Sequence, residues 1–109
     1  MTQRYEVIFY KQNNKNFIEE WLYSLRDNRG KSAIIRSIAR IEEGNFGEHR
    51  FCREGVWELV INTGPGYRIY YSLIGNTVVL LLCGGNKSTQ QKDINKAIEF
   101  LQHYKEDKK

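Results

Sequence analysis

The apolar run from Val78 to Cys83, VVLLLC, is the feature that most constrains the fold. A strand with one solvated face alternates apolar and polar residues, whereas a strand buried on both faces reads as a continuous apolar run. The run is far too short to span a bilayer. In a chain of 109 residues, it predicts a single domain over residues 1–109 with this segment as a central strand.

Periodic segments predict the remaining elements. Asn13 and Asn14 are expected to cap the first helix, and residues 45–54 to form a polar loop. The predicted order is strand, two helices, three strands, helix, which is an α+β fold with a small, mostly antiparallel sheet and the helices packed on one face. The expected strands are residues 5–10, 57–62, 67–73 and 77–83. Each expected helix has one apolar face. These faces consist of Phe17, Ile18, Trp21, Leu22 and Leu25 in the first helix, of Ile34, Ile35, Ile38 and Ile41 in the second, and of Ile94, Ala97, Ile98 and Leu101 in the third.

The turn Gly64-Pro65-Gly66 predicts a hairpin between the second and third strands. If residues 63–66 form the loop, Arg68 enters the apolar layer unpaired, which costs several kcal/mol. If residues 64–66 form the loop, Thr63 pairs with Tyr67 and the apolar and polar side chains separate onto two faces. The second register is favoured, and it predicts an open polar face with Arg68 near its middle and Tyr70 beside it.

Arg68 is the only cation between Arg53 and Lys87, and Glu58 is the only acid between Glu54 and Asp93. Two interpretations stand side by side. A cross-strand ion pair of Arg68 with Glu58 would be structural and would contribute little if exposed. A free Arg68 would be an anion site, because a guanidinium binds phosphate through a bidentate fork.

The loop Gly84-Gly85-Asn86-Lys87-Ser88-Thr89 joins the central strand to the last helix. Glycines before a helix N-terminus can bind phosphate through free backbone amides, although the Walker pattern is absent. Ser88 with Gln91 resembles a capping box, so an ordinary capped loop is the alternative. Because Lys87 leaves the sheet that displays Arg68, the two cations form a candidate phosphodiester site.

Other polar and aromatic residues extend this candidate site. The net charge of +4 permits a nucleic-acid partner without requiring one. Tyr70 is a candidate platform for stacking on a base of single-stranded RNA, and His49 is a candidate for proton transfer. Arg36, Arg40, Arg50 and Arg53 are candidates to widen the basic surface, although each is individually typical of a solvated charge.

The two cysteines, Cys52 and Cys83, form no metal-ligand pattern. We therefore expect no metal and no cofactor, and thiols that stay reduced. The N-terminal segment MTQRYEVIFY lacks the features of a signal peptide. The expected location is the cytoplasm, with no membrane contact.

The segments WELVINTGPGYRIYY and VVLLLCGGNKSTQQKDINKA resemble the phage Gp49-like, HigB-type branch of the RelE/ParE toxins of bacterial type II toxin–antitoxin modules. The resemblance covers nearly the whole chain, including the order of elements. It implies a small α+β endoribonuclease that needs no metal and that cuts messenger RNA in the ribosome, with the 2′-hydroxyl of the RNA as nucleophile. It also implies a cognate helix-turn-helix antitoxin as partner.

The resemblance assigns residue roles. Arg68 matches the strand arginine that stabilises the phosphorane, and Lys87 matches the basic residue after the last strand, which binds the phosphate or assists the leaving oxygen. Ser88 and the arginines Arg50 and Arg53 are then candidates for RNA binding. The proton-transfer residues of RelE itself are incomplete here, so Glu58 and Asp93 both stay open as the general base. Asp93 also has a structural alternative, since an acid in the first helical turn stabilises the helix dipole.

Two other functions remain open at this point. The ParE lineage shares the fold and inhibits DNA gyrase without being an enzyme. A phage remnant without activity is the third alternative, which growth arrest on expression would exclude.

Overall fold

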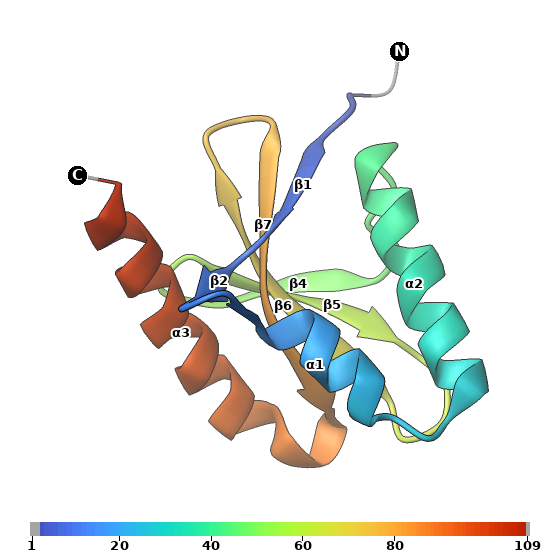
Figure 1. Ribbon diagram of the computed structural model, residues 1–109. Coiled ribbons are helices and arrows are strands. Elements are labelled where there is room, and N and C mark those ends of the chain that lie inside the picture. The colour runs from blue at the N-terminus through green and yellow to red at the C-terminus, as the bar shows by residue number, and fades with distance from the viewer. Residues whose placement is uncertain (1–2, 109) are drawn as a thin grey trace.

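The computed structural model describes residues 3–108, and its main feature is a five-stranded sheet with helices on both sides (Figure 1). The sheet has the strand order β1-β7-β6-β5-β4, and a separate two-stranded hairpin is formed by β2 and β3. The elements are β1 (Glu6–Phe9), β2 (Lys11–Gln12), β3 (Lys15–Asn16), α1 (Phe17–Ser24), α2 (Asn28–Glu42), β4 (His49–Arg53), β5 (Val56–Ile61), β6 (Tyr67–Ile74), β7 (Val78–Asn86), the 3-10 turn η1 (Lys87–Thr89) and α3 (Gln90–Asp107).

The apolar run of β7 is central, as its sequence predicts. β7 pairs in parallel with β1 and antiparallel with β6, and all other neighbours in the sheet are antiparallel. Its residues 79–82 are completely buried. The α+β class and the mostly antiparallel sheet are therefore confirmed.

The helices do not share one face of the sheet, which corrects the sequence-based expectation. Val79 and Leu81 belong to a hydrophobic cluster with residues of α1 and α2, whereas Leu80 and Leu82 belong to a second cluster with residues of α3. Figure 1 shows α2 and α3 on opposite sides of the sheet. The physical reason lies in β7 itself, because a strand that is apolar on both faces needs cover on both.

The β5–β6 hairpin differs from the expected register by two residues. Ile61 pairs with Tyr67, and Val60 with Arg68, so residues 62–66 form the loop. The loop is closed by a hydrogen bond from the Gly66 amide to the Thr63 carbonyl oxygen at 3.1 Å. A shift by two residues preserves the alternation of side chains, so the predicted division into two faces holds even though the predicted pairs do not.

Two local expectations were wrong. Residues 49–53 form the edge strand β4 instead of a polar loop. Asn13 and Asn14 do not cap a helix: both have positive φ, 53° and 66°, and they form the turn between β2 and β3. The cap of α1 is Asn16, whose side chain accepts a hydrogen bond from the Glu19 amide.

Among the described residues, no helix has the length and apolarity needed to cross a membrane.

Candidate functional site

Arg68 is buried between the sheet and the start of α3. It lies on β6, and only 6% of its surface is exposed. The expectation of an open polar sheet face is therefore wrong, because α3 covers the face on which Arg68 and Tyr70 lie. A guanidinium in this position needs partners inside the protein.

Glu58 supplies the main partner of Arg68. Its carboxylate is completely buried, and Oε1 lies 3.4 Å from Nε of Arg68. Oε2 accepts a hydrogen bond of 2.5 Å from Nε of Arg50 on the edge strand. Gln90, the first residue of α3, donates from Nε2 to Oε1 at 2.7 Å. One carboxylate thus holds two guanidinium groups, and this contact raises the pKa of Arg50.

Lys87 lies beside Arg68 at the hairpin loop. Nη1 of Arg68 donates to the Gly66 carbonyl oxygen at 3.0 Å. A Cβ atom added at Gly66 would stand 3.3 Å from Nη1 of Arg68 and 3.8 Å from Cβ of Lys87, so both residues flank this glycine. Lys87 is exposed and begins the turn η1. The exposed side chain of Lys87 thus starts close to the largely buried guanidinium of Arg68, and two positive charges in one region favour the binding of an anion.

The two glycines before Lys87 allow close packing on both faces of β7. A Cβ atom at Gly84 would stand 2.3 Å from the ring of Trp21 in α1, and one at Gly85 would stand 1.9 Å from Oδ2 of Asp93 in α3. Oδ2 of Asp93 also accepts a hydrogen bond of 2.5 Å from the Thr89 hydroxyl. Gly85 pairs with Arg68 across the sheet, so Asp93 fastens the start of α3 over the same part of the sheet.

Comparison with known proteins identifies the family. The family model of phage derived protein Gp49-like matches residues 20–105. The chain belongs to this Gp49-like family. An uncharacterized protein of Haemophilus influenzae is 44% identical over 79 residues, which cover 72% of this chain and 80% of the relative. Membership of the family is consistent with a toxin of a toxin–antitoxin module, which has an antitoxin as its partner.

In this Gp49-like chain, Tyr70 is not available to stack on a base, which corrects the sequence-based expectation. Its side chain is completely buried in the cluster that α3 covers. Burial raises the pKa of its hydroxyl, and the nearby carboxylates of Glu58 and Asp93 raise it further. Among the described residues, the Tyr70 hydroxyl has no hydrogen-bond partner.

The other candidate residues of the Gp49-like chain divide between the site and its surroundings. Arg50 joins the site through Glu58, whereas Arg53 forms a hydrogen bond with Asn95 on α3. Ser88 is exposed, and its hydroxyl donates to Oδ1 of Asn86 at 2.6 Å. Asn86 and Thr89, in place of Ser88 and Gln91, form the capping box at this turn.

His49 lies away from this group. The centroid of its ring lies 5.7 Å from that of Phe46 and 6.1 Å from that of Trp57, and both of these rings belong to the cluster on the α1–α2 face.

Gln90 is the contact residue that sequence reasoning missed, because its position next to Glu58 depends on where α3 begins. Among residues 3–108, no group of three or more His, Cys, Asp or Glu side chains could hold a metal ion.

Proposed function

We propose that this protein is the toxin of a type II toxin–antitoxin module and an endoribonuclease that cuts messenger RNA on the ribosome. The observation that carries the proposal is that Arg68 and Lys87 both lie beside Gly66. Lys87 is exposed to solvent, while Arg68 is buried and paired with Glu58. The positive charges of Arg68 and Lys87 are expected to attract a phosphate strongly, because the dielectric constant at the protein surface is lower than that of bulk water.

The proposed reaction uses the 2′-hydroxyl of the substrate. Its oxygen attacks the adjacent phosphorus while a base takes its proton, and the phosphorane gains negative charge. The bond to the 5′ oxygen then breaks, and that oxygen takes up a proton. The products are a 2′,3′-cyclic phosphate and a 5′-hydroxyl. In this scheme Arg68 and Lys87 stabilise the phosphorane, and Lys87 also faces the leaving oxygen.

The two carboxylates receive different roles in the proposal. Both oxygens of Glu58 contact nitrogen donors, from Arg50, Arg68 and Gln90. We therefore assign Glu58 to positioning Arg68. Asp93, which packs over the glycine paired with Arg68, is assigned as the general base.

The test is controlled expression in growing bacteria with three readouts: incorporation of labelled methionine, integrity of a reporter message and plasmid supercoiling. We expect methionine incorporation to stop while supercoiling persists, and co-expression of a cognate helix-turn-helix antitoxin to restore growth. A block of supercoiling with intact messenger RNA would instead indicate a ParE-like inhibitor of gyrase. No growth arrest would indicate an inactive remnant.

A further inference from the structure

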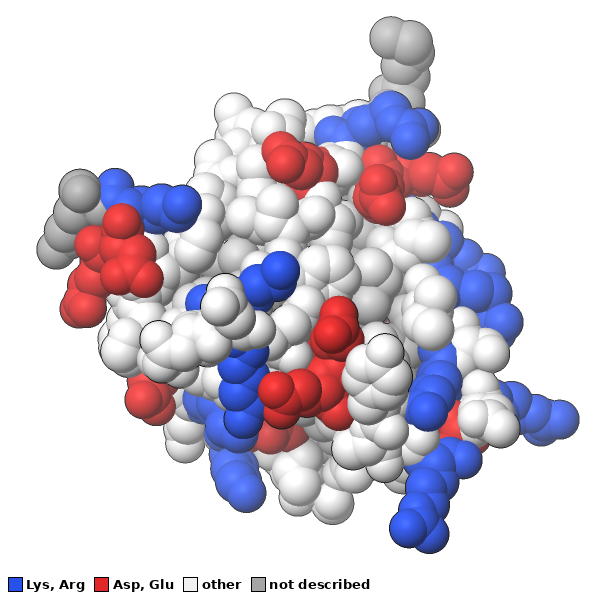
Figure 2. All heavy atoms as spheres, viewed as in Figure 1, with Lys and Arg blue, Asp and Glu red and all other residues white. Residues whose placement is uncertain are grey.

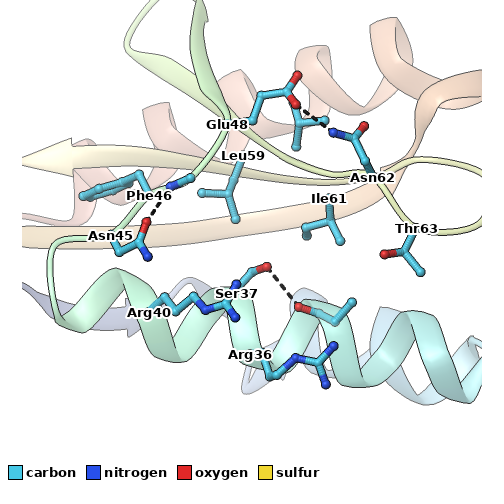
Figure 3. A pocket seen from close by; sticks show the side chains of 13 residues that line it. Arg36, Ser37, Arg40, Asn45, Phe46, Glu48, Leu59, Ile61, Asn62 and Thr63 are labelled. Atoms are coloured by element: carbon cyan, nitrogen blue, oxygen red, sulfur yellow. Dashed lines mark hydrogen bonds between the residues drawn. The ribbon is translucent and has the colours of Figure 1, made fainter.

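A polar groove of about 340 Å³ lies between α2 and β5, on the face of the sheet opposite α3 (Figure 3). Leu59 and Ile61 form its floor, but they are only 2% and 5% exposed. The accessible lining is therefore polar, and its volume falls within the range of small-ligand sites. The polar lining residues are Arg36, Ser37, Arg40, Asn45, Glu48, Asn62 and Thr63.

Two arginines form one rim of the groove. Arg36 and Arg40 are exposed and lie one turn apart on α2, with a rise of roughly 6 Å between them. Neither forms an ion pair with another residue of the region that the structure describes. Figure 2 shows lysines and arginines along the side of the molecule that α2 occupies in Figure 1. This rim is suited to a phosphate, which a guanidinium binds through two parallel hydrogen bonds.

The opposite rim selects among anionic partners. Nδ2 of Asn62 donates to Oε1 of Glu48 at 2.7 Å, and Figure 3 shows this pair across the groove from the arginines. A carboxylate here would repel the side chains of an acidic peptide. It can accept hydrogen bonds from ribose hydroxyls, as acidic residues do in nucleotide sites. A groove that binds phosphate on one rim and ribose on the other is suited to a ribonucleotide.

The groove also adjoins the candidate catalytic site at the hairpin loop. Thr63 lines the groove, whereas Gly66 accepts a hydrogen bond from Arg68 and lies near Lys87. The Gly66 amide donates to the Thr63 carbonyl oxygen at 3.1 Å, so the two ends of this turn touch. A strand of RNA that crosses the hairpin loop can therefore reach both sites.

We propose that this groove binds one ribonucleotide of the RNA strand, with its phosphate on Arg36 and Arg40 and its ribose on Glu48 and Asn62. The inference rests on the proposed function, because it assumes that RNA is the substrate. It assigns to α2 a contact with the substrate outside the site of cleavage.

The test measures the binding of a short fluorescent single-stranded RNA, and of DNA of the same sequence, by anisotropy. The variant R36Q/R40Q is compared with R26Q/R29Q, which removes the same charge from exposed positions outside the groove. We expect at least about a tenfold loss of RNA affinity for the first variant and less than about twofold for the second. Wild-type protein should prefer RNA to DNA, and Glu48→Ala should abolish that preference.

Equal losses in the two double variants would mean that only net charge matters and would overturn the proposal. Equal affinity of the wild type for RNA and DNA would overturn the ribose contact. Unlabelled 5′-AMP and unlabelled RNA are compared as competitors of the fluorescent RNA. If 5′-AMP competes with the higher apparent affinity, the groove binds free nucleotides and the assignment to an RNA strand is wrong. Cleavage on ribosomes is measured in parallel. If the protein cuts messenger RNA but R36Q/R40Q binds RNA as well as the wild type, only the groove inference is wrong. If R36Q/R40Q loses RNA affinity but the wild type does not cut, only the proposed nuclease activity is wrong.

Discussion

Arg68 and Glu58 form an ion pair between the sheet and α3, with Nε of Arg68 3.4 Å from Oε1 of Glu58 and both side chains more than nine-tenths buried. The two residues are not directly opposite, because Glu58 pairs with Tyr70 and Arg68 with Val60. The contact is diagonal across the hairpin, and α3 closes it through Gln90. Structural and functional interpretations of Arg68 are thus compatible, since the pair that buries the guanidinium also positions it.

Removing the Glu58 carboxylate should destabilise the protein. Glu58→Ala leaves Arg68 buried without its charged partner, for which we expect a loss of about 3–5 kcal/mol in the free energy of unfolding. Urea denaturation followed by circular dichroism measures this loss. The control is Glu106→Ala, at an exposed position near the end of α3, which should change stability by less than about 0.5 kcal/mol. Equal effects of the two changes would contradict a buried role for Glu58.

Gly85 should tolerate no side chain while Asp93 is present. Gly85→Ala places a Cβ atom 1.9 Å from Oδ2 of Asp93 and 2.9 Å from Oγ1 of Thr89. We expect a cost of about 1–3 kcal/mol, as for other overpacked sites. In a double-mutant cycle, the same change in an Asp93→Ala background should cost less. If the effects of Gly85→Ala and Asp93→Ala on the free energy of unfolding are additive, Asp93 does not pack tightly against Gly85.

Lys87 should matter for activity and not for stability. It is exposed, so Lys87→Ala should leave the unfolding midpoint unchanged. On the proposed mechanism, cleavage on ribosomes should fall about 10²-fold, as for the loss of one stabilising donor. Lys105→Ala removes the same charge from α3 far along the chain and should leave the rate nearly unchanged. Similar rates for the two variants would show that the glycine–lysine loop is not a site.

Asp27 should make the stability depend on pH in acid. The Gly30 amide and the Tyr67 hydroxyl donate hydrogen bonds to its carboxylate, and these hold the pKa of Asp27 below its usual range. A lowered folded-state pKa gives stability that is present above the unfolded value, near 3.9, and is lost as the pH falls through the folded value.

Unfolding of wild type and Asp27→Asn at several pH values between about 5 and 2 measures this dependence. The wild type should lose stability more steeply than the variant over this range. Tyr67→Phe, which removes one of the donors, should give an intermediate slope. Parallel curves for all three proteins would mean that Asp27 does not titrate abnormally.

Much of the fold could be predicted from local patterns. The apolar run of β7 indicated a central strand, and the alternation in β5 and β6 indicated which side chains share a face, because a two-residue shift in register leaves faces unchanged. The edge strand β4 was missed because its sequence, HRFCR, is polar and only one of its edges pairs. The wrong placement of α3 followed from treating the polar face as open, although β7 itself required cover on both sides.

The candidate site was predicted less completely. Arg68 lies on β6, and Lys87 follows directly after β7, two positions beyond the residue that pairs with Arg68. The order of the strands and the loop after β7 could therefore indicate that these two residues lie close together. The burial of Tyr70 depends on α3, a helix distant in sequence, and the residue pattern of β6 alone does not indicate that this ring is covered. The contacts of Glu58 with Arg50 and Gln90 arise from the edge strand and from the start of α3, which the pattern of charges does not indicate.

The most direct test of the central claim is primer extension on a reporter message incubated with translating ribosomes and purified protein. Arg68→Lys is the decisive variant, because it keeps a positive charge next to Glu58 but lacks the additional N–H donors of the guanidinium, whose Nε faces Glu58 and whose Nη1 donates to Gly66. We predict cuts in frame with codons for the wild type, and loss of the cuts for Arg68→Lys and Lys87→Ala proteins whose circular dichroism matches the wild type. Unchanged cutting by a folded Arg68→Lys protein, or no cutting by a wild-type protein that arrests growth, would contradict the account.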